Sequence, residues 1–171
     1  PADRKTDRPT VLYLGRLKAY KSVDVLLRAF RRVIIERPES RLVIAGDGDE
    51  IGRLRRLAFE ELRLGRDRVE FLGFVDEEKK KSLLQEAWML VNPSMMEGWG
   101  IVAVEANACG TPVIASDVPG LRDSVRNSLS GFLVPYGDAE ALAEKMLLLI
   151  RDRKLREDMN QCAREWAEHF D

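Results

Sequence analysis

The chain has 171 residues, of which 45% are hydrophobic and 33% are charged. Its 28 basic and 29 acidic residues give a formal net charge of −1, which argues against a general attraction to nucleic acid or to an anionic membrane. No apolar run approaches the ~20 residues of a membrane span, and the two cysteines have neither zinc nor redox spacing. We therefore expect one cytoplasmic domain, or two very small ones, with a substantial core.

The first ten residues, PADRKTDRPT, are charged and flanked by prolines. We interpret residues 1–10 as the remnant of a linker and residues 11–171 as the domain that follows it. On this interpretation the chain is a domain taken from a longer protein.

From residue 11 onward, short apolar runs alternate with helical spacing. Ser22, Asp76 and Asp138 are predicted as helix N-caps, and Gly110 as a helix C-cap. In chain order we expect a strand at 11–15, a helix at 23–34, a strand at 42–46, a helix at 54–62, a strand at 69–72, a helix at 76–87, a strand at 88–91, a helix at 100–109, strands at 113–115 and 132–134, and helices at 138–150 and 155–170.

This alternation predicts a doubly wound, Rossmann-like α/β domain, in which a parallel sheet of about six strands has helices on both faces. Ligands of such sheets bind at the carboxyl ends of the strands, near the switch in strand order. The loops at 15–21 and 92–100 follow the first and fourth strands, so we expect the site there. In the second loop, glycines bracket Trp99, whose ring either packs under a ligand or fills a gap in the core.

Two carboxylates mark this second segment. Glu105 shares a helix face with Ile101, Val104 and Ala108, and a carboxylate on an apolar face is costly unless it is paired. Glu105 therefore either meets a backbone amide or an arginine in the core, or accepts hydrogen bonds from ligand hydroxyls. Glu97 precedes a helix start that attracts anions, but it would repel a phosphate itself, so we expect it to face a hydroxyl group. A ligand with a phosphate and a sugar meets both demands.

Arg16 and Lys21 lie in the loop that precedes the first helix. Cations there oppose the helix dipole, so they are either solvated loop charges or partners of an anion that they share with the helix. Combined with the second helix start at Gly100, the pattern favours one diphosphate held by both loops.

Two other patterns have alternative interpretations. Asp47 and Asp49 follow a strand in GDGDE, where a plain glycine turn is favoured over a divalent-metal pair, and the third glycine of a dinucleotide fingerprint is absent. Phe71, Phe74 and Val75 either border a flat ligand such as a base or pack in the core.

Five segments occur in order and at normal spacing: GRLKAYKSVDVLLRAF at 15–30, VIAGDGDE at 43–50, VEFLGFV at 69–75, EGWGIVAVEANACGTPVIAS at 97–116 and GFLVPYGD at 131–138. Together they resemble the C-terminal, donor-binding domain of the retaining glycosyltransferases of group 1 (family 4), which have the two-domain GT-B fold. The resemblance implies metal-independent transfer of a hexosyl group from a UDP-, GDP- or ADP-sugar to a glycan, lipid or small-molecule acceptor, without a further cofactor. A non-catalytic nucleotide-sugar-binding module and a nucleotide-sugar epimerase are the alternatives.

The resemblance also implies roles for individual residues. Arg16 and Lys21 match the positions that grip the diphosphate, Glu97 matches the glutamate that faces the donor sugar, and Glu105 matches the one that binds the ribose hydroxyls. Ser22 departs from the glycine that the family often has. The implied catalytic residues are Glu97, Arg16 and Lys21, and the implied substrate-binding residues are Gly15, Phe74, Val75, Gly98, Trp99, Gly100, Ile101 and Glu105.

The family has an N-terminal domain that holds the acceptor site, and we expect that domain to be missing here. Any peripheral contact with a membrane would then be made by the missing domain, and the isolated chain should not transfer sugar. Without that partner we expect Trp166 and Phe170 of the tail helix to be exposed.

Overall fold

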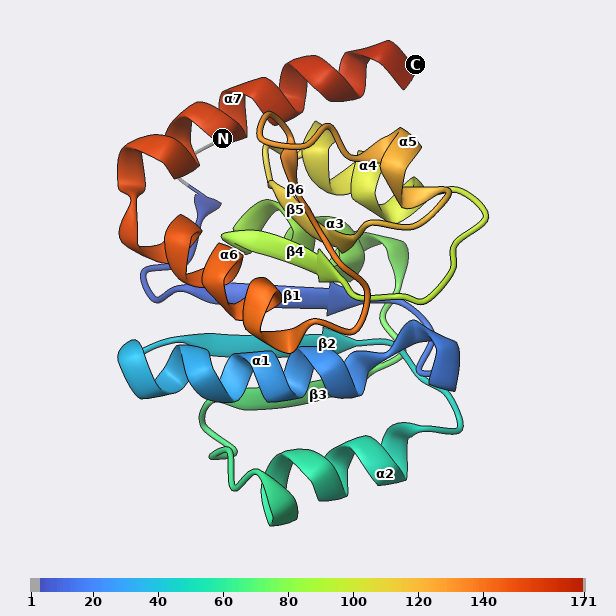
Figure 1. The fold of residues 1–171 in the computed structure, drawn as a ribbon, viewed down its shortest axis with the longest axis vertical. Helices are drawn as coiled ribbons and strands as arrows, with labels where there is room; N and C mark the ends of the chain where they lie inside the picture. The colour runs from blue at the N-terminus through green and yellow to red at the C-terminus, as the bar shows by residue number, and fades with distance from the viewer. Residues whose placement is uncertain (1–3, 171) are drawn as a thin grey trace.

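A single parallel sheet forms the centre of the computed structural model, which describes residues 4–170 (Figure 1). Its six strands lie in the order β3-β2-β1-β4-β5-β6, and every pairing is parallel. The strands are β1 (Thr10–Leu14), β2 (Arg41–Ala45), β3 (Val69–Gly73), β4 (Met89–Asn92), β5 (Val113–Ser116) and β6 (Gly131–Val134). The prediction of a doubly wound sheet is confirmed, and the strand order switches between β1 and β4.

Helices cover both faces of this sheet (Figure 1). They are α1 (Val23–Glu36), α2 (Ile51–Arg56), α3 (Glu77–Glu86), α4 (Ile101–Ala108), α5 (Leu121–Ser124), α6 (Ala139–Arg151) and α7 (Arg153–Ala167). Short turns of other helix types are η2 (Ala19–Lys21), η3 (Leu57–Glu61, a π-helical continuation of α2) and η4 (Glu168–Phe170).

The core has two layers because successive side chains of a strand point to opposite faces. Val11 and Tyr13 of β1 pack with α1, α2 and α6, whereas Leu12 packs with α3, α4 and α5. All three side chains are buried. Apolar residues on both faces explain why the strands read as continuous apolar runs in the sequence.

The helix ends agree with the sequence at three of four positions. The side chain of Asp76 accepts a hydrogen bond from the backbone of Lys79, that of Asp138 accepts from Ala141, and Gly110 follows α4 with a positive φ of 74°. Ser22 stands at the predicted N-cap position of α1, but it does not cap the helix with its side chain. Its backbone is left-handed (φ 56°), and its hydroxyl makes no cap hydrogen bond.

Helix α4 does not bury the face that Ile101, Val104 and Ala108 share. Ile101 is 60% exposed, and Ala108 is also exposed. The sequence IVAVEANA is apolar on nearly every side, so spacing alone did not identify the packed face. The residues that α4 buries are Ala103, Ala106 and Asn107.

The segment before β1 lies against the domain. The backbone N–H of Thr6 donates to the carbonyl of Glu86, and the Lys5 ammonium donates to the carbonyl of Ala87. Strand β1 begins at Thr10, one residue before the expected start. Across residues 4–170, no helix combines the length and the apolar character needed to cross a membrane.

Candidate functional site

The loops that follow β1 and β4 meet at the switch in strand order. Both strands point toward the same edge of the sheet (Figure 1), and the loops are joined there by a backbone hydrogen bond of 2.8 Å from Met95 N–H to the Tyr20 carbonyl. A side-chain ion pair between Lys21 and Glu97 joins them a second time. The two segments singled out in the sequence therefore form one site.

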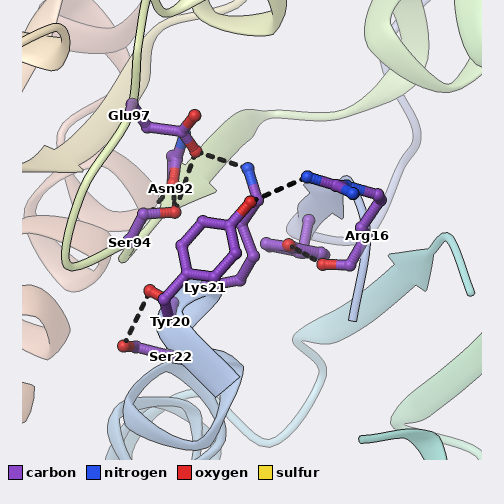
Figure 2. Close-up of polar contacts among 8 residues, drawn as sticks. Arg16, Tyr20, Lys21, Ser22, Asn92, Ser94 and Glu97 are labelled. Atoms are coloured by element: carbon purple, nitrogen blue, oxygen red, sulfur yellow. Dashed lines mark hydrogen bonds and ion pairs between the residues drawn. The ribbon is translucent and has the colours of Figure 1, made fainter. Parts of the chain in front are cut away.

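The Lys21–Glu97 pair lies at the centre of this site (Figure 2). Lys21 Nζ donates to Glu97 Oε1 at 2.6 Å, and the two side chains are only 15% and 14% exposed. Asn92 Nδ2 lies 3.3 Å from the same oxygen. The hydroxyl of Ser94 lies 2.9 Å from Glu97 Oε1 and 2.7 Å from Asn92 Oδ1, so its single proton serves one of them at a time. Glu97 is thus held by several donors in a fixed orientation.

Arg16 extends beside this pair and is exposed (Figure 2). Its Nη2 donates to the hydroxyl of Tyr20 at 2.9 Å, and Lys21 Nζ lies 5.3 Å from the centroid of the Tyr20 ring. Beneath the loop, the hydroxyl of Tyr13 donates to the Arg16 carbonyl at 2.8 Å. Burial, reinforced by the charge of Glu97, raises the pKa of Tyr13, so this donor stays protonated.

The start of α4 opens onto the same place. A pocket of about 90 Å³ is lined by both loops and by the first turn of α4, including Gly15, Lys21, Glu97, Trp99, Gly100 and Ile101. The first N–H groups of a helix lack intrahelical partners and carry a partial positive charge. An anion in this pocket would meet these amides and the Lys21 ammonium together.

Glycines shape this entrance in different ways. A Cβ on Gly100 would lie 2.1 Å from the hydroxyl oxygen of Ser124, so close packing requires a glycine there. A Cβ on Gly98 would meet no atom within 4 Å. Gly98 therefore borders open space, where a ligand has room to approach the backbone.

Trp99 is 41% exposed and packs against the end of the chain rather than filling a gap in the core. Its ring centroid lies 5.4 Å from that of Phe170, which in turn lies 5.0 Å from that of Trp166. The expectation that Trp166 and Phe170 are exposed is wrong, because these rings pack on each other and both side chains are partly buried. Trp99 also lines the pocket, so it supports the site from the side of the C-terminal turn η4.

Glu105 has a partner that the sequence did not suggest. Its Oε2 lies 2.9 Å from the ammonium of Lys80 on α3, whereas a backbone amide or an arginine was expected. Its Oε1 is buried and has no hydrogen-bond partner among residues 4–170. A buried carboxylate oxygen without a donor is costly, and a ligand would reach this atom only if the carboxylate turned away from Lys80.

The residues after β3 separate into two groups. Phe71 packs edge-on against Phe59 at 5.8 Å, which supports the interpretation of core packing. Phe74 is 82% exposed, and Val75 is partly buried. Neither Phe74 nor Val75 lines the pocket beside Lys21, so a ligand would have to extend along the strand ends to reach them.

The Asp47 and Asp49 side chains do not converge. Asp47 Oδ1 accepts from the adjacent backbone N–H of Gly48, and Asp49 Oδ2 lies 3.5 Å from Lys18 Nζ. A Cβ on Gly46 would lie 1.8 Å from a backbone oxygen, so a close approach of two loops requires this glycine. Within residues 4–170, no group of three or more His, Cys, Asp or Glu side chains is arranged to hold a metal ion.

Four contributors were missed in the sequence. Asn92 lies at the end of β4, where side chains of a parallel sheet reach the ligand edge, so its position was a usable signal. Ser94 and Tyr20 contact Glu97 and Arg16, which are only three and four residues away, but no helical or strand spacing marked these contacts in their loops. Lys80 carried no signal, because its partner Glu105 lies on another helix.

Comparison with known proteins adds an independent finding. A family model described as "Glycosyl transferases group 1" matches residues 2–166. The phosphatidyl-myo-inositol mannosyltransferase of Mycobacterium leprae is 38% identical over 164 residues, which are 95% of this chain and 42% of that protein.

Solved structures show the same fold. Sucrose-phosphate synthase from Thermosynechococcus elongatus superposes with a TM-score of 0.85 and 36% identity, covering 95% of this chain and 41% of that one. The Anabaena protein HepE, solved with UDP-glucose, gives a TM-score of 0.86 and 26% identity, covering 95% and 44%. The chain thus spans about two fifths of the length of these relatives.

Proposed function

The chain belongs to the group 1 glycosyl transferases, with the fold of one half of a GT-B enzyme, and from that premise we propose that it binds the nucleoside diphosphate sugar donor of a retaining hexosyltransferase. The observation that carries this proposal is the joining of two cations, a helix start and a held carboxylate at the switch between β1 and β4.

Each part of the site suits one part of such a donor. Arg16 and Lys21 supply positive charge for the diphosphate, and the amides that begin α4 supply hydrogen-bond donors. Glu97, held beside Lys21, faces the sugar hydroxyls. The carboxylate of Glu105, whose side chain is partly exposed, accepts from a ribose hydroxyl. The structure of HepE with UDP-glucose shows that one protein of this fold binds a donor of this class.

In the transfer, the bond between the anomeric carbon and the diphosphate oxygen breaks, and its electron pair remains on the diphosphate. The acceptor oxygen forms the new bond to that carbon, and its proton passes to the oxygen of the departing diphosphate. Arg16, Lys21 and the start of α4 oppose the negative charge that grows on the leaving diphosphate. Removing one such preorganised donor typically costs about 3–4 kcal/mol of transition-state stabilisation.

The remaining parts of the reaction are assigned to the rest of the protein. The relatives are more than twice as long as this chain, so we assign the acceptor site to an N-terminal domain. We expect this chain to bind the donor weakly and to transfer no sugar alone. The reaction needs no metal in this proposal, because the cations of the site are side chains.

Titration calorimetry of the chain with UDP-, GDP- and ADP-sugars tests donor binding directly. Lys21→Ala should weaken binding by more than tenfold, or at least about 1.4 kcal/mol. Lys18→Ala is the matched control, because Lys18 lies in the same loop but pairs with Asp49, and its effect should be within twofold. Absence of millimolar binding to any of the three donors, or equal effects of the two substitutions, would refute the proposal.

A further inference from the structure

Tyr20 contacts both cations and both loops of the site. Its hydroxyl accepts from Arg16 Nη2 at 2.9 Å, and its ring lies 5.3 Å from Lys21 Nζ. Its backbone carbonyl accepts from Met95 of the other loop at 2.8 Å. No other residue described in 4–170 makes hydrogen-bond or cation–π contacts with both Arg16 and Lys21.

The two cations need such an anchor for different reasons. Arg16 is exposed and has a long side chain, so it would otherwise sample many rotamers, which a bound anion would have to restrict. Lys21 already pairs with Glu97, and a cation within about 6 Å of an aromatic ring is attracted to its face. The ring of Tyr20 therefore gives Lys21 a second favourable contact that does not compete with an anion.

We propose that Tyr20 is a positioning residue, which orients Arg16 and Lys21 for the diphosphate before the donor arrives. This inference rests on the proposed donor-binding function. Tyr20 touches no reacting atom in this scheme. Its hydroxyl acts through Arg16, and preorganised groups bind more tightly because less freedom is lost on binding.

Tyr20→Phe isolates the hydroxyl, because it keeps the ring and the backbone bond to Met95. The matched control is Tyr136→Phe, which removes a hydroxyl that lies 2.8 Å from that of Ser22 and contacts neither cation. The probes are UDP, GDP or ADP, whichever the unaltered chain binds best, and the nucleoside with the same base.

Tyr20→Phe should weaken binding of the diphosphate by about fivefold to tenfold, close to the factor expected for 1.4 kcal/mol, and should leave nucleoside binding unchanged. Tyr136→Phe should change neither. In an Arg16→Ala background, Tyr20→Phe should have no further effect on the diphosphate, because residues that act through one another are not additive.

Relaxation of the Arg16 side-chain nitrogens, measured by NMR without ligand, gives a second readout. Arg16 should become more mobile in Tyr20→Phe and not in Tyr136→Phe. Unchanged diphosphate affinity together with unchanged Arg16 mobility, or additive effects in the double variant, would overturn the inference and leave the donor-binding proposal intact. If the unaltered chain binds none of the three diphosphates, the donor-binding proposal fails and this inference fails with it.

Discussion

Replacing Glu97 with glutamine should make the chain bind nucleoside diphosphates more tightly, while it should lower turnover in the full-length enzyme. The ammonium of Lys21 is engaged by Glu97 at 2.6 Å in the ligand-free structure. A diphosphate must therefore share Lys21 with a carboxylate. Glutamine has nearly the same shape as glutamate but no negative charge, so Lys21 becomes available to the ligand.

The size of the effect follows from the geometry of the pair. Two unit charges 2.6 Å apart attract by about 6 kcal/mol at an effective dielectric constant of ~20. Desolvation offsets most of this, and a hydrogen bond to a charged group contributes about 1.5–3 kcal/mol net. If about 1.4 kcal/mol of that becomes available to the ligand, the affinity for a nucleoside diphosphate rises about tenfold.

The same substitution should lower stability. Lys21 is only 15% exposed, so losing its counter-charge costs about 2 kcal/mol, below the range for fully buried pairs. For a chain of this length, that corresponds to a decrease in Tm of about 4–8 °C. A saturating diphosphate should therefore stabilise the variant more than it stabilises the unaltered chain.

Calorimetry and thermal unfolding with and without diphosphate measure both effects. Glu105→Gln is the matched control, because it neutralises the second carboxylate of the site, and it should weaken binding by removing an acceptor for ribose hydroxyls. In the full-length enzyme, Glu97→Gln should lower turnover by about 10²–10³. If Glu97→Gln binds the diphosphate more weakly than the unaltered chain does, Glu97 and the ligand do not compete for Lys21, and the reasoning is refuted.

Three further predictions concern other residues. In the full-length enzyme, Arg16→Ala should lower kcat by about 10²–10³. The free energy of unfolding of the chain should change by less than about 0.5 kcal/mol, because Arg16 is exposed. Near-normal turnover would contradict a role of Arg16 in catalysis. Burial lowers the pKa of Lys5 to about 8. As the pH rises, Lys5 therefore loses its proton in the folded state before it does in the unfolded state. The free energy of unfolding should consequently rise by up to about 1.4 kcal/mol per pH unit from pH 8 toward 10.5. In urea titrations across that pH range, the unfolding free energy of Lys5→Met should rise less with pH. The same pH dependence in Lys5→Met and in the unaltered chain would contradict a lowered pKa of Lys5. Gly100→Ala should destabilise the chain by about 1–3 kcal/mol through overpacking against Ser124, whereas Gly98→Ala should cost less than about 1 kcal/mol, and equal costs in thermal unfolding would contradict the predicted crowding.

The sheet and the location of the site were predictable from the sequence because both depend on local patterns. Apolar runs separated by helical spacing identify parallel strands, and the rule for strand ends then selects the loops at 15–21 and 92–100. The strand order and the pair formed by these loops agree with that reasoning.

Pairings across long sequence separations were not predictable. Lys21 and Glu97 are 76 residues apart, and no local pattern indicates that they form an ion pair without a ligand. The pairing of Glu105 with Lys80 depends in the same way on how α3 lies beside α4.

The local sequence also did not predict the backbone conformation of Ser22. Serine is a favoured N-cap residue, but here the chain enters α1 through a left-handed residue with φ 56°. That conformation suits glycine, which is the residue that the resemblance to the family implies for this position. The hydroxyl of Ser22 instead lies 2.8 Å from that of Tyr136.

The tilted contact between the rings of Trp99 and Phe170 connects η4 to the loop that carries Glu97. If η4 moves away from the domain, Trp99 loses its ring neighbour and the loop at 92–100 gains freedom. Deleting residues 168–170 would therefore expose more of Trp99 without altering any residue that lines the pocket. The turn η4 thus supports this loop from outside the pocket.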